Sequence, residues 1–202
     1  RFGRTVTGQT SRPAPIPGLG LESDKFDPAA IDAHFEAYIE TLLATTGAPK
    51  RPGRGLTTLH FDSWEMGAQN WSADFAAAFE KRRGYAPLRF LPALTGRVVD
   101  SVEVTERFLW DLRQAAQELV IENHVGRLRG LAAKRGLAFS SEPYDLNPCS
   151  NMEMGAVADV PMCEFWSKGF GFTTEFSCIE AASTAHTTGK AVVAAEAFTA
   201  AP

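Results

Sequence analysis

Short apolar segments alternate with segments of helical periodicity along most of this sequence, and this alternation limits the possible folds more than any other feature. Five apolar segments are predicted to be strands: Leu56–Phe61, Leu88–Leu94, Leu137–Ser141, Val160–Phe165 and Ala191–Ala195. Apolar strands separated by helices are typical of a parallel sheet covered by helices. Right-handed crossovers then place the carboxyl end of every strand at the same edge of the sheet. We therefore expect an α/β fold.

Capping residues and helical spacing mark the segments between these strands. Helices are predicted over residues 27–47, 72–84, 105–135 and 174–188, whereas residues 1–21 are predicted to be an irregular N-terminal segment. Asp27 is a good N-cap residue, Pro28 suits the first helical position, and Gly47 ends the run. Ser72 is a candidate cap for the second helix, and Gly126 and Gly130 are expected to bend or divide the third. Residues 22–202 are thus predicted to form the folded domain.

The composition excludes several classes of protein. The chain has 202 residues with 45% hydrophobic residues, which is enough for one buried core. Its net charge of −4 argues against nucleic acid or an anionic membrane as the main partner. We find neither an apolar run long enough to span a membrane nor a signal peptide. The three cysteines form no C-x-x-C motif, so a disulfide scaffold and a zinc site are not expected.

Four of the predicted strands end in a carboxylate, and these residues are Asp62, Glu142, Glu164 and Glu196. A carboxylate at the rim of an apolar strand is costly unless it is paired, metal-bound or functional. One such residue alone is commonly a helix N-terminal residue, a salt-bridge partner or a solvated loop residue, and this alternative stays open for each. Four at one edge, however, favour a common site, and in a TIM-type barrel that edge carries the catalytic residues.

Aromatic residues flank these carboxylates and suggest what the site binds. They are Trp64, Trp71, Tyr144, Phe165 and Trp166. Aromatic faces stack on the apolar faces of sugar rings, and carboxylates bind hydroxyl groups, so the combination indicates a carbohydrate cleft. The same acidic residues are also compatible with a hard-cation site, because Ca²⁺ takes several oxygen ligands. The loop 145–159 is long enough to form a wall of the cleft. His60, within the first strand, is expected to be structural.

Ordered motifs resemble those of glycoside hydrolase family 106, the α-L-rhamnosidases. The segment Asp62–Trp71 is similar to the family's D-S-W-E-x-G-x-x-N-W motif. The likeness continues through 81–85, 91–96, 106–111, Ser141-Glu142-Pro143-Tyr144, Glu164-Phe165-Trp166, Ala185-His186 and Ala195-Glu196-Ala197-Phe198-Thr199. Each motif alone is weak, whereas the ordered set covers nearly the whole chain and is specific.

This resemblance implies a (β/α)₈ TIM-barrel catalytic domain within a larger multidomain protein. It implies hydrolysis of terminal α-L-rhamnosyl linkages with inversion, and a calcium ion at the active site. Glu65 would be the general acid and Glu196 the general base. Asp62, Trp64, Glu142, Tyr144 and Trp166 would bind substrate, and Glu164 would bind the metal. The partners would be a rhamnose-containing oligosaccharide or glycoside and the remaining domains, and the substrate class alone implies secretion or a periplasmic location.

The proposed chemistry requires two carboxyl groups with different roles. An inverting glycosidase needs a protonated carboxyl group near the leaving oxygen and an ionised carboxylate that activates water, about 6.5–9.5 Å apart. Glu65 and Glu196 follow the first and last predicted strands and can face each other across a barrel mouth. A full barrel needs eight strands and the chain offers five, so we expect a partial barrel. A glycosidase with other sugar specificity or a retaining mechanism, and a non-catalytic or truncated sugar-binding fragment, remain alternatives.

Overall fold

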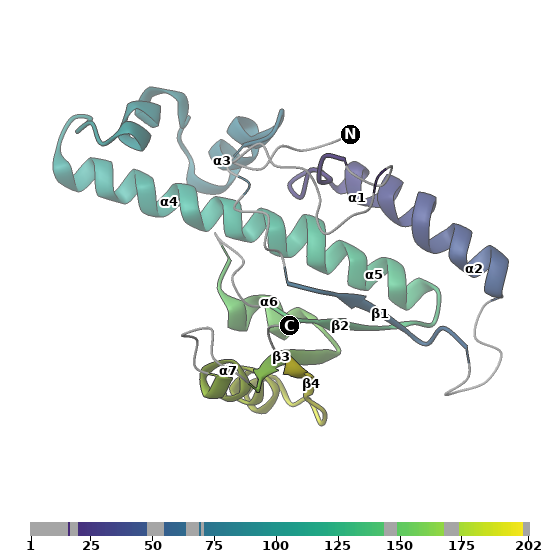
Figure 1. Cartoon of the computed structure of the whole chain (residues 1–202). Helices are drawn as coiled ribbons and strands as arrows, with labels where there is room; N and C mark the ends of the chain where they lie inside the picture. Colours follow the sequence, from purple (N-terminus) through teal and green to yellow (C-terminus); the bar gives the residue numbers. More distant parts are fainter. Residues whose placement is uncertain are drawn as a thin grey trace.

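Four parallel strands form one sheet whose strand order follows the sequence. The computed structural model in Figure 1 describes residues 16, 20–47, 55–63, 69, 71–143, 149–167 and 174–199. The strands are β1 (Thr58–Phe61), β2 (Ala138–Ser141), β3 (Val160–Trp166) and β4 (Ala194–Thr199). The α/β fold with a parallel sheet is confirmed. Within the described ranges the sheet has four strands rather than five and is open, so a closed barrel is not confirmed.

The helices account for most of the remaining described residues. They are α1 (Pro28–Phe35), η1 (Glu36–Glu40), α2 (Thr41–Thr46), α3 (Phe75–Arg83), η2 (Leu88–Thr95), α4 (Val102–Val120), η3 (Ile121–Val125), α5 (Gly126–Lys134), α6 (Asn151–Val157) and α7 (Thr174–Thr188). The predicted cap of the first helix is confirmed, because the Asp27 side chain accepts a hydrogen bond from the Ala29 N–H at 2.9 Å. Among the described helices, none is both long and apolar enough to cross a membrane.

A π-helical turn, η3, joins α4 to α5 in one long helical segment (Figure 1). The helix predicted over residues 105–135 is therefore confirmed, and its irregularity is the π-helical turn that ends just before Gly126, whereas Gly130 lies within the regular helix α5. A Cβ atom at Gly126 would lie 2.8 Å from the carbonyl oxygen of Ile121, which is closer than carbon and oxygen tolerate. Glycine thus allows the wider turn at this position.

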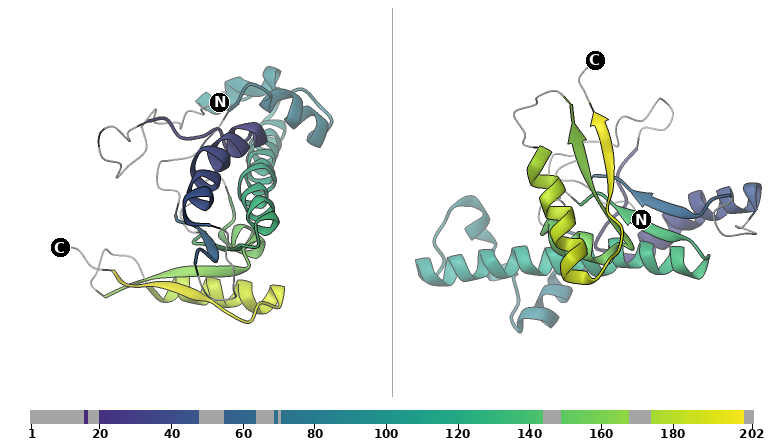
Figure 2. Two further views of the ribbon diagram at one scale, coloured as in Figure 1. Left: turned by 90° about the vertical axis from the view of Figure 1, so that its right-hand side faces the viewer. Right: turned by 90° about the horizontal axis from the view of Figure 1, so that it is seen from below.

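The helices cover one face of the sheet. Figure 2 shows the long helical segment beside β1 and β2, and α7 beside β3 and β4. The ring of Phe61 on β1 packs edge-on against buried His124 of η3, with centroids 4.8 Å apart. Burial holds the pKa of His124 well below its usual value, so this imidazole is neutral. Because side chains alternate along a strand, the neighbours of Phe61 face the opposite side of the sheet.

The predicted strand Leu88–Leu94 is wrong, because this segment is the 3₁₀-helix η2. Pro92 lies inside it and has no N–H to donate to a sheet. The Phe90 N–H instead donates to the carbonyl oxygen of Pro87 at 2.9 Å, and the Phe90 ring stacks on Phe108 with centroids 5.3 Å apart. Leu88 is 60% exposed. This apolar segment thus packs on α4 through the ring of Phe90 and does not enter the sheet.

Three further boundaries differ from the predictions. The last strand begins at Ala194 rather than at 191, because Met162 is the first residue of β3 that pairs with it. The helix predicted from Ser72 begins at Phe75, after an N-cap residue, Asp74, whose side chain makes no capping hydrogen bond. The loop predicted over 145–159 contains α6, and residues 144–148 lie outside the described part.

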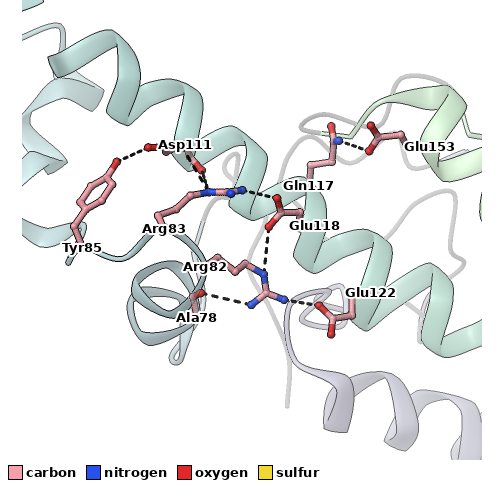
Figure 3. A network of polar contacts seen from close by, with 9 residues as sticks. All are labelled: Ala78, Arg82, Arg83, Tyr85, Asp111, Gln117, Glu118, Glu122 and Glu153. Atoms are coloured by element: carbon pink, nitrogen blue, oxygen red, sulfur yellow. Dashed lines mark hydrogen bonds and ion pairs between the residues drawn. The ribbon is translucent and has the colours of Figure 1, made fainter. Parts of the chain in front are cut away.

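Aromatic packing and ion pairs hold α3 against α4. Figure 3 shows Arg82 and Arg83, in the last turn of α3, paired with Glu118 of α4, and Arg82 also with Glu122 of η3; Arg83 meets Glu118 at 2.5 Å. The Tyr85 hydroxyl group donates to Asp111 of α4 at 2.9 Å (Figure 3), and burial raises the pKa of this tyrosine. The phenylalanine rings beneath these contacts are fully buried. This packing fixes the end of α4 that extends beyond the sheet (Figure 1).

We expect Phe79→Ala to lower the free energy of unfolding by about 3–5 kcal/mol. Phe79 is 0% exposed and contacts the rings of Tyr85 and Phe108, at centroid distances of 5.1 and 6.0 Å. Urea denaturation of the two proteins measures the difference. Phe79→Leu is the matched control and should lose much less, because most of the buried volume is kept. Equal losses for both variants would contradict this account of the core.

Candidate active site

Four carboxylates lie toward the carboxyl edge of the parallel sheet. Asp62 follows β1 directly, and Glu142 follows β2 with its N–H donating to the carbonyl oxygen of Phe61 at 3.0 Å. Glu164 and Glu196 lie inside β3 and β4, not after them as the sequence suggests, and they pair directly across the two strands. Strand alternation places Glu164 and Glu196 on the face opposite the helices.

Three of these carboxylates converge. One carboxylate oxygen each of Asp62, Glu142 and Glu196 lies within 4.8 Å of the other two. Asp62 and Glu196 are exposed, whereas Glu142 is 1% exposed. Glu164 is also buried but is not a member of this group. We call Asp62, Glu142 and Glu196 the carboxylate group.

Glu142 is the buried member of the carboxylate group, and its pKa is raised above the usual value of a glutamate. Burial, a hydrogen bond with Asp62 and the negative charges of Asp62, Glu164 and Glu196 raise its pKa to about 8. At neutral pH Glu142 therefore carries a proton in the absence of a cation. Among the described residues, its Oε1 atom has no hydrogen-bond partner although it is buried. A buried oxygen of this kind is suited to accept a ligand.

A histidine and a serine lie on the same face of the sheet as the carboxylate group, two residues before Asp62 and Glu142. His60 pairs with Ser140 across β1 and β2, and its Nδ1 atom is 3.0 Å from the Ser140 Oγ atom. Its Nε2 atom is 3.8 Å from Asp62 Oδ1. His60 is thus hydrogen-bonded, as a structural residue should be, but it also faces the site. In the sequence His60 precedes Asp62 by two residues, and this spacing on a strand predicts that both side chains lie on the same face.

The other residues expected at the site are only partly accounted for. Trp64, Glu65 and Tyr144 lie outside the described residues. Trp166 ends β3 and is partly exposed. Trp71, one of the aromatic residues expected to line a cleft, packs on Phe75 of the core with centroids 4.8 Å apart. It therefore contributes to stability rather than to a cleft wall.

The carboxylate group offers oxygen ligands of the type that a calcium ion binds. Calcium binds oxygen ligands at about 2.3–2.6 Å, so two of its ligands are at most about 5 Å apart. The oxygens of the group are within 4.8 Å of one another, and the partnerless oxygen of Glu142 belongs to the same residue set. A divalent cation would also offset the repulsion that raises the pKa of Glu142. Further ligands would have to come from other groups, since three carboxylates alone leave positions open.

Comparison with known proteins relates the chain to glycosidases. A protein of Formosa agariphila named "Putative beta-glucuronidase" is 43% identical over 199 residues, which cover 98% of this chain and 17% of that protein. The solved structure of a rhamnosidase from Novosphingobium sp. PP1Y matches 94% of this chain and 19% of its own, with a TM-score of 0.82 and 33% sequence identity. The chain thus spans less than a fifth of either relative.

A family profile settles where the chain belongs. The profile of glycoside hydrolase family 106, described as alpha-L-rhamnosidase, matches residues 1–202, the whole chain. The structural match to a rhamnosidase agrees with this profile, and so do the ordered motifs in the sequence. The chain belongs to glycoside hydrolase family 106, the alpha-L-rhamnosidase family.

Proposed function

We propose that this chain supplies part of the active site of a glycoside hydrolase that cleaves terminal α-L-rhamnosyl linkages with inversion. The observation that carries the proposal is the convergence of Asp62, Glu142 and Glu196 at the carboxyl edge of the sheet. Family membership supports the same reaction. The substrate would be a rhamnose-containing oligosaccharide or glycoside, and a secreted or periplasmic location is proposed from this substrate class alone.

We also propose that the sheet is part of a (β/α)₈ barrel. Its strands are parallel and follow one another in sequence order, and the helices lie on one face. A doubly wound sheet would instead reverse its strand order and place helices on both faces. The carboxylates face the side without helices, which is the interior in a barrel. Residues of a longer protein would provide the remaining strands and domains.

The two catalytic roles are assigned to Glu65 and Glu196. Glu196 is exposed on the edge strand β4, where its carboxylate can take a proton from an attacking water molecule. Glu65 follows Asp62 by three residues, so covalent geometry keeps their Cα atoms within about 11 Å of each other. The inverting mechanism requires the carboxyl groups of Glu65 and Glu196 to lie about 6.5–9.5 Å apart. Trp64, Tyr144 and Trp166 are proposed to contact the sugar.

Asp62, Glu142 and Glu196 are proposed to hold a calcium ion, with Glu164 as a fourth acidic residue beside them. When bound, calcium would stabilise the ionised carboxylates through its positive charge and would coordinate sugar hydroxyl groups. Glu142 must then release its proton, since a calcium ligand is ionised. His60, 3.8 Å from Asp62, helps to orient that carboxylate.

A second sugar specificity has one observation in its favour, which is the name of the relative from Formosa agariphila. Aryl glycosides distinguish the two candidates. Cleavage of an aryl β-glucuronide without cleavage of the α-L-rhamnoside would replace the proposed substrate. A gap of about 5 Å between the two catalytic carboxyl groups would indicate a retaining mechanism. Binding of rhamnosides without turnover by the full-length gene product would indicate a non-catalytic protein.

We expect Glu65→Gln and Glu196→Gln, each made in the full-length gene product, to lower kcat on an aryl α-L-rhamnoside by at least about 10²-fold. Proton NMR of the first product should show β-L-rhamnose, as inversion requires. Glu103→Gln is the matched control, because this side chain is 85% exposed on the far part of α4. Near-native rates for either catalytic variant would refute its assigned role.

We expect the stability of the metal-free protein to fall as the pH rises from about 4.5 to about 8. An exposed glutamate has a pKa of 4.5, whereas burial and nearby negative charge raise the pKa of Glu142 to about 8 in the folded protein. Between these values the folded protein keeps a proton that the unfolded chain releases, so a higher pH favours unfolding. Melting temperatures measured with a chelator present should show this slope. The slope should flatten in Glu142→Gln, and an unchanged slope would contradict the shifted pKa.

We expect calcium to raise the melting temperature of the protein and a chelator to lower its activity, because calcium binds only the folded carboxylate group. Glu142→Gln and Asp62→Asn should weaken calcium binding at least about tenfold, measured by isothermal titration calorimetry. Glu103→Gln should bind calcium as the unmodified protein does. Activity and stability that ignore both calcium and chelator would remove the metal from the proposal.

A further inference from the structure

Two cysteines that are distant in the sequence meet behind the site. Cys163 on β3 and Cys178 on α7 are 15 residues apart in the chain, and their sulfur atoms are 3.5 Å apart. Cys163 is 4% exposed, and Cys178 is partly exposed. The third cysteine, Cys149, lies against the carbonyl oxygen of Gln117 at 3.8 Å. The sequence predicts no disulfide scaffold, and the spacing of the cysteines does not reveal this pair.

We propose that Cys163 and Cys178 are the site of a disulfide bond that joins β3 to α7 under oxidising conditions. A disulfide needs a sulfur–sulfur distance of about 2.05 Å, so the two atoms must approach by about 1.5 Å. Rotation of the two side chains would have to supply this movement.

A neighbouring hydrogen bond holds the two elements in register. Ser177 precedes Cys178, and its hydroxyl group donates to the carbonyl oxygen of Glu164 at 2.8 Å. Glu164 in turn follows Cys163. Two adjacent pairs of residues, Cys163–Cys178 and Glu164–Ser177, therefore meet across β3 and α7. The hydrogen bond of the second pair fixes the relative position of the two cysteines. The cysteines meet through a defined packing of helix on strand, not through a chance encounter of two loops.

The reaction balances with glutathione disulfide as the oxidant. The more accessible Cys178 loses its proton to solvent and attacks one sulfur of glutathione disulfide, which breaks that bond and releases one glutathione. Cys163 then loses its proton and attacks the sulfur of Cys178, which releases the second glutathione. The two protein thiols are oxidised to one disulfide, and glutathione disulfide is reduced to two glutathione thiols.

The cross-link would stabilise the strand that carries Glu164 without moving the carboxylates. Cys163 and Glu164 are successive residues of β3, so their side chains point to opposite faces. The disulfide lies on the helical face, and the carboxylate group lies on the other. We therefore expect oxidation to slow thermal inactivation and to leave kcat at 25 °C within about twofold, because the loop between the two cysteines is closed in the unfolded chain.

Peptide mapping of the full-length gene product tests the proposal directly. The protein is equilibrated with glutathione disulfide, alkylated, and digested after Lys168 and Glu153, which separates the three cysteines into different peptides. Mass spectrometry should find the peptides of Cys163 and Cys178 joined, and dithiothreitol should separate them. The melting temperature of the oxidised protein should be higher by on the order of 5 °C.

Variants of each cysteine complete the test. Cys178→Ser should abolish the joined peptides and the difference in melting temperature between oxidised and reduced protein. Cys149→Ser is the matched control and should keep both. Full alkylation of Cys163 and Cys178 in the oxidised protein, a stable glutathione adduct on Cys178, or a Cys149–Cys163 pair would overturn the proposal. The peptide result does not depend on activity, so it stands or falls separately from the proposed reaction.

Discussion

The parallel pairing of β1 to β4 is the constraint on which the rest of the structure depends. It brings residues from four distant parts of the sequence to one edge, and it directs Glu164 and Glu196 to the same face because they are register partners. A shift of one residue in either strand would turn its carboxylate toward the helices. The register therefore decides both where the site lies and which side chains enter it.

Bringing the three carboxyl groups together costs electrostatic free energy, and apolar packing in the helical part of the fold offsets this cost. One carboxylate oxygen each of Asp62, Glu142 and Glu196 lies within 4.8 Å of the other two, and burial together with this proximity disfavours the ionised form of Glu142. The stabilising apolar contacts lie on the helical side of the sheet, where rings such as Phe79 and Phe139 are fully buried. Acidic residues and apolar core thus lie on opposite faces of one layer of strands.

Local signals in the sequence predicted most helices and the four strands, the last with shifted bounds, and they failed where tertiary contacts decide. Capping by Asp27 and the period of the long helix depend on neighbouring residues, so they could be predicted. The segment Leu88–Leu94 could not, because an apolar run suits a strand or a helix, and here the Phe90 ring packs on Phe108. The shift of β4 followed from its pairing with Met162, which no local pattern records.

The sequence by itself determined the α/β class, the acidic residues near the strand ends and the family, since each depends on the order of residues along the chain. Only the tertiary structure decided that Asp62, Glu142 and Glu196 converge, that His60 faces Asp62, and that Cys163 meets Cys178. Strand register and helix packing bring these atoms together, and both depend on contacts between segments many residues apart. The raised pKa of Glu142 has the same origin, because burial and nearby charge come from the folded chain.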